Sequence, residues 1–172
     1  MKDAILGAAI EVVAIHGLNN WTVEEVANRA RCAKGLVNYH YRSKQDLLIQ
    51  VAETIRDDRS ARRLAAVQSS GATALDRLWE TLVREVESGW FGARLSFLAT
   101  DGPLRTAAGT DPKSAGSFAL TLGKALDLSD HLLPRASLIE ATLDGLQLGL
   151  LQGVSPAAVE EDYHRFWLTV LP

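Results

Sequence analysis

Apolar residues recur at helical spacing along nearly the whole chain. Close to its start, one face of a helix would carry Ile5, Ala8, Ala9, Val12 and Ile15. This pattern predicts an amphipathic helix over residues 2–16, and the glycine that follows is typical of a helix C-terminus.

A second and a third helix are expected close behind the first. Thr22 and Glu25 have the spacing of a capping box, in which each side chain accepts a hydrogen bond from the other residue's backbone N–H. The second helix should therefore begin directly after Thr22. A break over residues 31–33 separates it from a short third helix, from Lys34 to about His40.

The fourth helix is predicted to be long. Ser43 stands where an N-cap is expected, and apolar residues from Leu47 to Ile55 follow at helical spacing. The later part of this helix, residues 56–63, mixes arginine with aspartate and predicts a solvated face. Residues 68–71 then form the best candidate boundary.

The remainder of the chain is also predicted to be helical. Asp111-Pro112 and Ser155-Pro156 each combine an N-cap residue with a proline at the first helical position, and Asp101-Gly102-Pro103 is expected to form a turn. The further helices are expected over residues 73–88, 112–126, 134–151 and 156–170. Since no alternating strand pattern of useful length occurs, the fold class is all-α.

Charge is distributed unevenly over this helical pattern. The 172-residue chain carries a formal net charge of −3, yet residues 29–44 hold five basic side chains and no acidic one. Residues 1–63 sum to +2 and residues 64–172 to −5. A basic segment in an acidic chain favours DNA as its partner, while an ordinary solvated surface is the alternative.

Composition excludes several classes of protein. With 47% hydrophobic and 23% charged residues the chain has the balance of a soluble globular protein, and no apolar run is long enough to span a membrane. The N-terminus does not have the form of a signal peptide, and the single cysteine, Cys32, suits a cytoplasmic location. Because His131 and His164 have no Cys or His at metal-ligand spacing, no metal or cofactor is expected.

Two short helices joined by a tight break are the ingredients of a helix-turn-helix, whose second helix lies in the DNA major groove. Lys34 is suited to guanine, Leu36 to a thymine methyl group, and Asn38 to an adenine edge. Side chains suited to phosphate lie beside them. The predicted DNA-binding residues are Thr22, Ala33, Lys34, Gly35, Leu36, Asn38, Tyr39, His40, Tyr41 and Lys44.

Residues 5–55 resemble the DNA-binding domain of the tetracycline-repressor (TetR) family of bacterial transcription regulators. The resemblance rests on residues 22–27, on Ala30, and on residues 34–44 followed by Leu47-Leu48. It implies a homodimer with a helix-turn-helix domain, residues 1–46, and a C-terminal domain, residues 47–172, for dimerisation and small-molecule binding. Helix four would connect the two domains.

Four positions depart from the family pattern. Arg31 stands where glycine is common in the turn, and a non-glycine residue in the left-handed conformation costs about 1 kcal/mol. Ala33 replaces a common serine, so the third helix loses a side-chain cap. Asn38 replaces a common tyrosine and Arg42 a common proline, so an operator sequence does not transfer from relatives.

The C-terminal residues give two further predictions. Trp79, Trp90, Phe97 and Phe118 are candidate linings of a ligand pocket, although aromatic residues more often form plain core. A stripe of small residues recurs every four positions at Ala141, Gly145, Gly149 and Gly153, and the final helix carries a broad apolar stripe rich in aromatic residues. The predicted dimer interface comprises Gly145, Gly149, Tyr163, Phe166 and Trp167, and packing of both stripes inside the monomer is the alternative.

The sequence therefore predicts a DNA-binding repressor, released from a palindromic operator when a small molecule binds. The alternative is a ligand-binding or protein-interaction dimer that no longer regulates transcription, which the departures at Arg31 and Ala33 would favour. An enzyme is not expected, because no catalytic set, nucleophile elbow or phosphate-binding loop is found.

Overall fold

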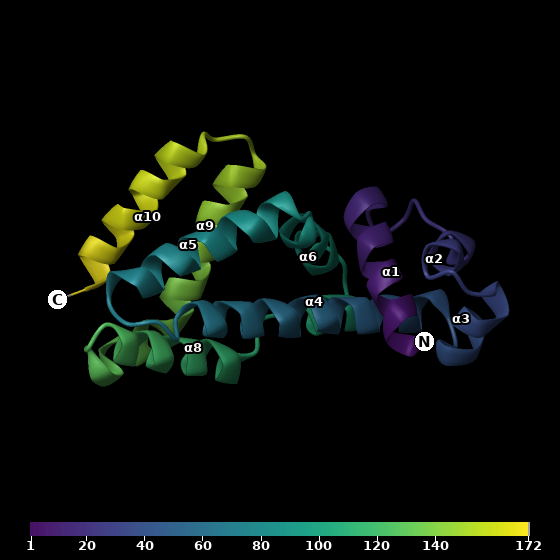
Figure 1. The fold of residues 1–172 in the computed structure, drawn as a ribbon, viewed down its shortest axis with the longest axis horizontal. Coiled ribbons are helices and arrows are strands. Elements are labelled where there is room, and N and C mark those ends of the chain that lie inside the picture. Colours follow the sequence, from purple (N-terminus) through teal and green to yellow (C-terminus); the bar gives the residue numbers. More distant parts are fainter. Residues whose placement is uncertain (172) are drawn as a thin grey trace. The chain divides into compact units, whose positions relative to one another are not determined.

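The computed structural model describes residues 1–171, apart from the side chains of residues 129 and 130, and this part of the chain is helical without strands. Figure 1 shows the helices in chain order. Their bounds are α1 (Lys2–His16), α2 (Val23–Arg29), α3 (Lys34–His40), α4 (Lys44–Ala66), α5 (Ala72–Glu87), α6 (Trp90–Leu98), α7 (Pro103–Ala108), α8 (Pro112–Ala125), the 3₁₀ helix η1 (Ser129–Arg135), α9 (Ala136–Leu151) and α10 (Pro156–Val170). The predicted all-α fold is confirmed.

The chain forms two compact units. Unit 1 comprises Met1–Asp58 and Ser88–Gly109, and unit 2 comprises Arg59–Glu87 and Thr110–Pro172. The division therefore falls inside α4, and residues 88–109 belong with the N-terminal helices. The predicted division after residue 46 separates a DNA-binding domain from a ligand-binding domain. It stays a prediction, because the compact units do not show which residues carry which function.

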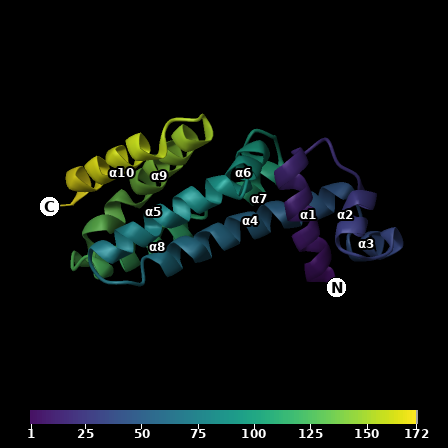
Figure 2. The ribbon, with the colours of Figure 1, turned by 45° about the horizontal axis from the view of Figure 1, so that its top comes forward.

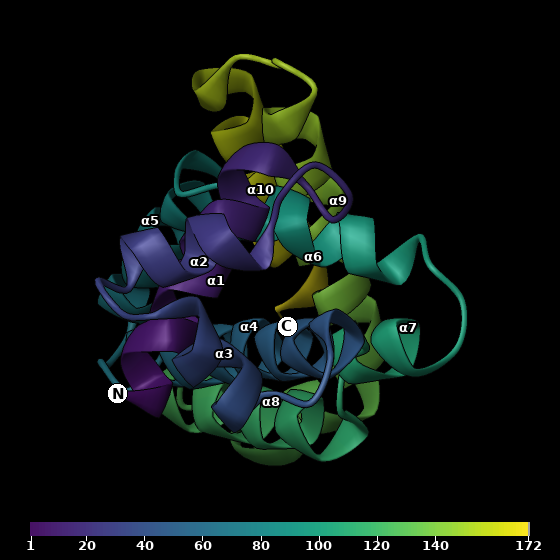
Figure 3. The ribbon, with the colours of Figure 1, turned by 90° about the vertical axis from the view of Figure 1, so that its right-hand side faces the viewer.

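Unit 1 is built around α1. This helix packs against α2, α3 and α6, and α6 packs against α7 (Figure 3). Ile5, Val12, Val26 and Val51 lie in one apolar core, to which α6 adds Phe97. The predicted bounds of α1 and α3 agree with the observed ones.

Three local signals in unit 1 act as predicted. Gly17 follows α1 with a φ of 74°, in the left-handed region that glycine adopts most easily. Thr22 and Glu25 form the full capping box, with the Glu25 amide donating to Thr22 Oγ1 at 3.2 Å and the Thr22 amide donating to Glu25 Oε2 at 2.6 Å. Ser43 Oγ accepts from the Asp46 amide at 3.0 Å at the start of α4.

Unit 2 is a bundle centred on α9. This helix packs against α5, α8, η1 and α10, and Figure 2 shows α9 and α10 running side by side after a short connection. Leu78, Leu122, Leu143 and Tyr163 are fully buried in its core. Asp111 and Ser155 cap α8 and α10 ahead of their prolines, as the sequence predicted.

Two expectations about the chain path were wrong in detail. The predicted turn at Asp101-Gly102-Pro103 contains the start of a helix, because Pro103 opens α7 at its first turn. Residues 134–135, predicted as the start of a long helix, belong to η1, and α9 begins at Ala136.

The prediction of a solvated, mixed-charge face over residues 56–63 was also wrong in part. Arg59 and Arg63, which belong to unit 2, are 6% and 1% exposed. A run of alternating charges usually marks a wet surface, but here long-range partners described below let two of the arginines enter the interior.

Candidate nucleic-acid interface

The turn between α2 and α3 is a Schellman motif. The Cys32 amide donates to the carbonyl of Ala27 at 2.9 Å, and the Arg31 amide donates to the carbonyl of Asn28 at 3.1 Å. This pair of bonds requires the first residue after the helix C-cap to adopt the left-handed conformation. That residue is Arg31, and it has a φ of 53°. The turn thus keeps the geometry that glycine would give, at a conformational cost of about 1 kcal/mol for its non-glycine residue.

The short helix α3 has two distinct faces. Val37 is fully buried and Leu36 packs against the core of unit 1, which anchors the helix. Lys34, Asn38 and Tyr39 are exposed on the other side. The face turned to solvent is therefore polar and basic, as direct readout of base edges requires.

The helix lacks a side-chain cap at its start. Ala33 occupies the N-cap position with extended backbone, and its side chain has no polar atom to accept a hydrogen bond. The Leu36 amide donates to the carbonyl of Ala33 at 2.9 Å, and the amides of Lys34 and Gly35 are left to solvent or to a partner.

No contact inside the monomer explains why position 35 is a glycine. A Cβ at this position would meet no heavy atom of the described residues within 4 Å, and Gly35 has no positive φ. A glycine inside a helix costs about 1 kcal/mol relative to alanine. Its presence on the exposed face is consistent with close approach of another surface to the backbone.

Cations surround this face with few internal partners. Lys34 Nζ lies 3.9 Å from Glu24 Oε2, a loose contact between exposed groups. The side chains of Arg31 and Arg42 are exposed, and neither forms an ion pair with a residue that the structure describes. These two arginines were absent from the predicted DNA-binding residues, although the acid-free run over residues 29–44 was the available signal.

The remaining predicted polar residues differ in accessibility. Thr22 is exposed, with its hydroxyl engaged by Glu25 in the capping box. Tyr39 is 81% exposed, and its ring lies edge-on to the half-buried His40 at 5.3 Å between centroids. An aromatic ring this exposed is available to a partner.

The structure corrects the prediction for Tyr41. Tyr41 is 3% exposed within the core of unit 1, and its hydroxyl has no hydrogen-bond partner among the described residues. Burial raises the pKa of this hydroxyl above its ordinary value, and the nearby Asp3 and Asp46 add to the rise. The side chain is therefore a core residue and not a surface contact to phosphate.

Lys44 makes a contact inside the monomer. Its Nζ donates to the carbonyl of Trp21 at 2.8 Å and lies 4.1 Å from the centroid of the Trp21 ring. This hydrogen bond and cation–π contact tie the start of α4 to the segment before α2. A role of Lys44 toward phosphate would add to this structural one.

The predicted pocket aromatics do not come together. Phe97 and Trp90 belong to the core of unit 1, whereas Trp79 and Phe118 are buried in the core of unit 2. Their side chains fill space within each unit, so the alternative that they are ordinary core residues describes them better.

The predicted dimer residues also separate. Tyr163 and Trp167 are 0% and 2% exposed, and Tyr163 donates from its hydroxyl to the carbonyl of Leu75 at 2.7 Å. Their assignment to an interface is corrected, because their side chains are already buried inside the monomer. Phe166 is half-buried, and a Cβ at Gly149 would lie 3.6 Å from Val159 of α10, whereas Gly145 is exposed with open space beside it.

Sequence reasoning missed a cluster of buried charged groups in unit 2. Arg63 donates to Glu140 at 3.0 Å, to Glu85 at 3.3 Å and to Gln147 at 2.6 Å. Arg59 donates to Glu140 at 2.8 Å and also to Asp144. The arginine cluster comprises Arg59, Arg63, Glu85, Glu140, Asp144 and Gln147.

The cluster favours the charged form of Arg59. Burial alone would lower the pKa of Arg59, but the carboxylates of Asp144, Glu140 and Glu85 outweigh it and raise that pKa. Gln147 completes the arrangement by donating to Glu85 at 2.8 Å and to the carbonyl of Leu82 at 3.0 Å. The partners lie 22 to 84 residues from Arg63 in sequence, so no local pattern could reveal them.

Comparison with known proteins identifies the helix-turn-helix. Residues 5–51 match the family described as "Bacterial regulatory proteins, tetR family". No curated protein matched the chain. This match confirms the resemblance of the N-terminal segment to the tetR family that was drawn from the sequence.

Solved structures share the fold of the whole chain. A Rhodococcus sp. protein assigned as a TetR-family transcriptional regulator has a TM-score of 0.75 at 20% identity, over 99% of this chain and 98% of that one. The multidrug binding protein EbrR, complexed with malachite green, has a TM-score of 0.72 at 22% identity, over 100% and 98%. A Saccharomonospora viridis protein assigned as a transcriptional regulator, in complex with choline, has a TM-score of 0.71 at 18% identity, over 96% and 94%.

These likenesses establish the fold of TetR-family transcriptional regulators for this chain. None of the helices that the structure describes is both long and apolar enough to cross a membrane.

Proposed function

We propose that this protein is a sequence-specific DNA-binding regulator of transcription that acts as a repressor. The observation that carries the proposal is the exposed face of α3, where Lys34, Gly35 and Asn38 point away from an anchored apolar side. A helix presented in this way fits the major groove, with Lys34 placed for guanine and Asn38 for adenine.

Contacts to the DNA backbone would come from groups around this helix. Arg31 and Arg42 are exposed guanidinium groups, Tyr39 offers an accessible hydroxyl, and Thr22 is exposed although Glu25 engages its hydroxyl. Such contacts fix the position of the protein on the duplex and add a salt-dependent term to its affinity.

A second copy of the chain would supply the other half of the site. On α9 the residues Leu138, Ala141, Gly145 and Leu148 are all exposed and follow one stripe at helical spacing. An exposed apolar stripe around a bare glycine fits close packing against its own copy across a two-fold axis. Two recognition helices related in this way require a palindromic operator.

Release from DNA is proposed to follow binding of a small molecule to unit 2. Two proteins with this fold are known in complex with malachite green and with choline, which supports a small-molecule ligand for this chain as well. A ligand lowers DNA affinity only as far as it binds better to the arrangement that does not fit the operator.

The rival reading, a dimer without a role in transcription, rested on Arg31 and Ala33. Arg31 keeps the left-handed conformation and both Schellman bonds, so its departure from glycine leaves the turn intact. This observation supports the regulator over the rival.

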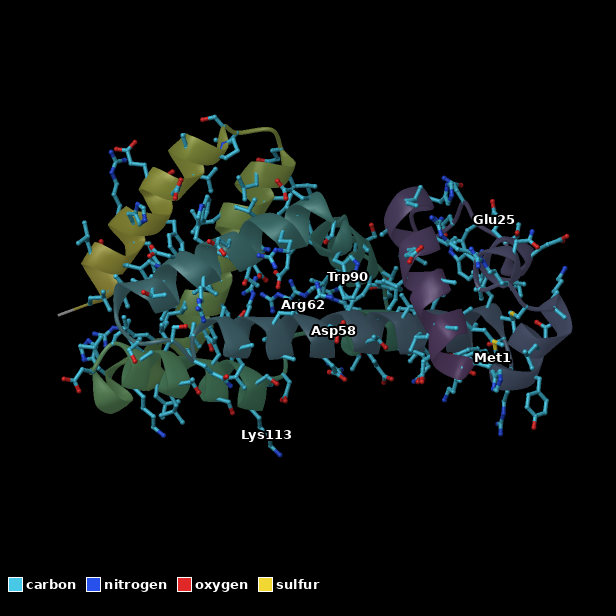
Figure 4. The ribbon with its side chains drawn as sticks, in the orientation of Figure 1. Met1, Glu25, Asp58, Arg62, Trp90 and Lys113 are labelled. Atoms are coloured by element: carbon cyan, nitrogen blue, oxygen red, sulfur yellow. The ribbon has the colours of Figure 1, made fainter. Side chains whose placement is uncertain are left out.

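Selection of bound duplexes from random DNA at two salt concentrations tests the proposal. We expect an enriched palindromic sequence, with Asn38→Ala relaxing the preference at one base pair by about 1–3 kcal/mol. Lys34→Ala should do the same at another base pair. Lys113→Ala is the matched control, because Lys113 is an exposed lysine that points away from α8 (Figure 4).

Two results would contradict this reading. Absence of any enriched sequence, with negligible affinity even at low salt, would remove the DNA-binding function. A uniform loss of affinity for all sequences on Lys34→Ala would move Lys34 from base readout to phosphate.

The dimer has its own test. Gly145→Arg adds bulk and charge at an exposed position with no atom of the described residues within 4 Å of the new Cβ, so the monomer fold should tolerate it. We expect the variant to be monomeric by light scattering, whereas Ser117→Arg, at an exposed position on α8, should keep the wild-type mass. A dimeric Gly145→Arg variant would place the interface elsewhere.

A further inference from the structure

A hollow of about 300 Å³ lies in unit 2 between α8 and α9. Two carboxylates, Glu140 and Asp144, and two hydroxyls, Thr110 and Ser137, line its wall. The rest of the wall is small and apolar, formed by two alanines and a proline of the same helices. The hollow is thus a polar site of the size of a small organic molecule.

Glu140 is the group that points to a ligand. Although this residue is only 9% exposed, one of its carboxylate oxygens is not used internally. Oε2 accepts from Arg59 at 2.8 Å and from Arg63 at 3.0 Å, whereas Oε1 accepts no hydrogen bond from the residues that the structure describes. Solvent in the hollow reaches Oε1, so this oxygen is open to a hydrogen-bond donor from a bound molecule.

The two arginines hold this carboxylate in place from behind. Arg59 and Arg63 reach it from α4, and their side chains are 7% and 1% exposed. Neither arginine lines the hollow. What a molecule in the hollow would meet is therefore the acidic side of the arginine cluster.

The wall chemistry selects the class of molecule. Anions would meet the carboxylates of Glu140 and Asp144, with no cationic side chain among the described lining residues to offset the repulsion. A quaternary ammonium ion is best held by aromatic faces, and the lining contains none. An ammonium group with N–H donors fits both the carboxylates and the hydroxyls.

We propose that the hollow between α8 and α9 binds a compact primary or secondary ammonium compound, whose N–H groups donate to Glu140 Oε1 and to Asp144. The apolar part of such a compound lies against the alanine and proline side of the wall. The assignment deepens the proposed function. An ammonium ion would compete with Arg59 of α4 for Asp144 and Glu140, so its binding would act on that helix. This link to release from DNA rests on the proposed function as a DNA-binding repressor.

Isothermal titration calorimetry of the full-length protein with butylammonium chloride tests the site. We expect saturable binding with one site per chain, at least tenfold weaker binding of butyltrimethylammonium, and none of the neutral analogue butanol. Equal affinity for the quaternary ion, or no binding of butylammonium at all, would overturn the proposal.

Two variants separate the site from the fold. Glu140→Gln keeps the volume and one acceptor but loses the charge, and we expect at least a tenfold loss of butylammonium affinity. Because this change also touches the arginine cluster, Ser137→Lys provides an independent variant that places an internal ammonium group at an exposed position in the same wall. We expect Ser137→Lys to fold normally and to lose binding, whereas Ser117→Lys on the exposed part of α8 should bind as the wild type does.

Unchanged affinity in both Glu140→Gln and Ser137→Lys would place the binding elsewhere and overturn the assignment. DNA affinity is measured separately, with and without butylammonium. Loss of DNA affinity on binding supports the regulatory link, and unchanged DNA affinity overturns that link while calorimetry still judges the site. A protein that binds no DNA at all refutes the proposed function and leaves the calorimetric result standing.

Discussion

The turn before α3 and the arginine cluster of unit 2 both depend on arginine, but in opposite ways. Arg31 is exposed, holds a left-handed conformation, and forms no ion pair with a described residue. Arg63 is fully buried in an ordinary helix and donates to three side chains. Arg31 thus has an unfavourable backbone conformation and no ion pair with a described residue. Arg63 has an ordinary helical conformation, and its charge is engaged by its partners.

The difference teaches where each region draws its stability. The turn is fixed by hydrogen bonds between residues at most five positions apart, so changes there should have small effects. The cluster is fixed by partners far apart in sequence inside a medium of low dielectric, so removal of one member leaves others buried without a partner. The consequences of mutation should therefore be unequal in the two regions.

The largest effect is expected for Arg63→Ala. Glu140, Glu85 and Gln147 would each lose a donor in the interior, and breaking a buried pair in this way costs about 3–5 kcal/mol. Urea unfolding followed by circular dichroism measures the loss. Arg165→Ala is the control, because its ion pairs with Glu161 and Asp162 are exposed and worth less than about 1 kcal/mol. Similar losses in the two variants would show that the cluster contributes nothing beyond a surface ion pair.

The next effect concerns alkaline pH. Burial raises the pKa of Tyr163 well above its ordinary value of 10.0, so above pH 10 the unfolded chain loses this proton while the folded chain keeps it. The free energy of unfolding should then fall with rising pH, by up to about 1.4 kcal/mol per pH unit. This contribution is fully present below pH 10 and is lost as the pH rises toward the folded-state pKa.

Denaturation at pH 8 and at pH 11 measures this decline, with Tyr163→Phe as the comparison. The phenylalanine variant should show a shallower decline, because it has no hydroxyl to ionise. The control is Tyr39→Phe, which removes an exposed hydroxyl and should leave the wild-type decline unchanged. An equally steep decline in wild type and Tyr163→Phe would mean that other groups cause it.

A smaller change of opposite sign is expected in the turn. Arg31→Gly removes a side chain from a residue with φ of 53° and should stabilise unit 1 by about 1 kcal/mol or slightly less. Thermal unfolding measures the gain. Arg31→Ala keeps a Cβ and should bring no such gain, so equal stabilisation by both would deny that the backbone conformation is the cause. DNA affinity should fall in both variants if Arg31 contacts phosphate.

The smallest effect is expected two residues further along the chain. Ala33→Ser supplies a hydroxyl at the N-cap of α3 and should add about 0.5–1 kcal/mol by accepting from an unsatisfied N–H group. Hydrogen exchange of the first amides of α3 measures it directly, with Ala33→Val as a control without a polar atom. Unchanged exchange in the serine variant would show that these amides already have partners.

Local signals predicted much of the helix-turn-helix. The Thr22–Glu25 box, the break over residues 31–33 and the bounds of α3 follow from rules that act within four or five residues. The same rules failed for Tyr41, whose position beside basic residues suggested a surface contact, and they did not predict the contact that Lys44 makes with Trp21. Their actual partners, the core of unit 1 and Trp21, come from other parts of the chain.

In unit 2 the sequence predicted the helices but not their neighbours. The small-residue stripe of α9 was noticed as one feature, yet Gly149 faces Val159 of α10 whereas Gly145 faces open space. The aromatic residues of α10 were read as an interface, yet Tyr163 and Trp167 face inward. Helical periodicity tells which residues share a face, but it does not tell what that face meets.

By itself, the sequence determined the all-α fold, the helix caps and the polar face of α3, because each depends on residues within one or two helical turns. The tertiary structure decided which arginines are exposed and which are buried, and where a carboxylate remains with a vacant acceptor. Those outcomes depend on the desolvation of charges by segments that meet only after folding, and that free energy has no local signature in the chain.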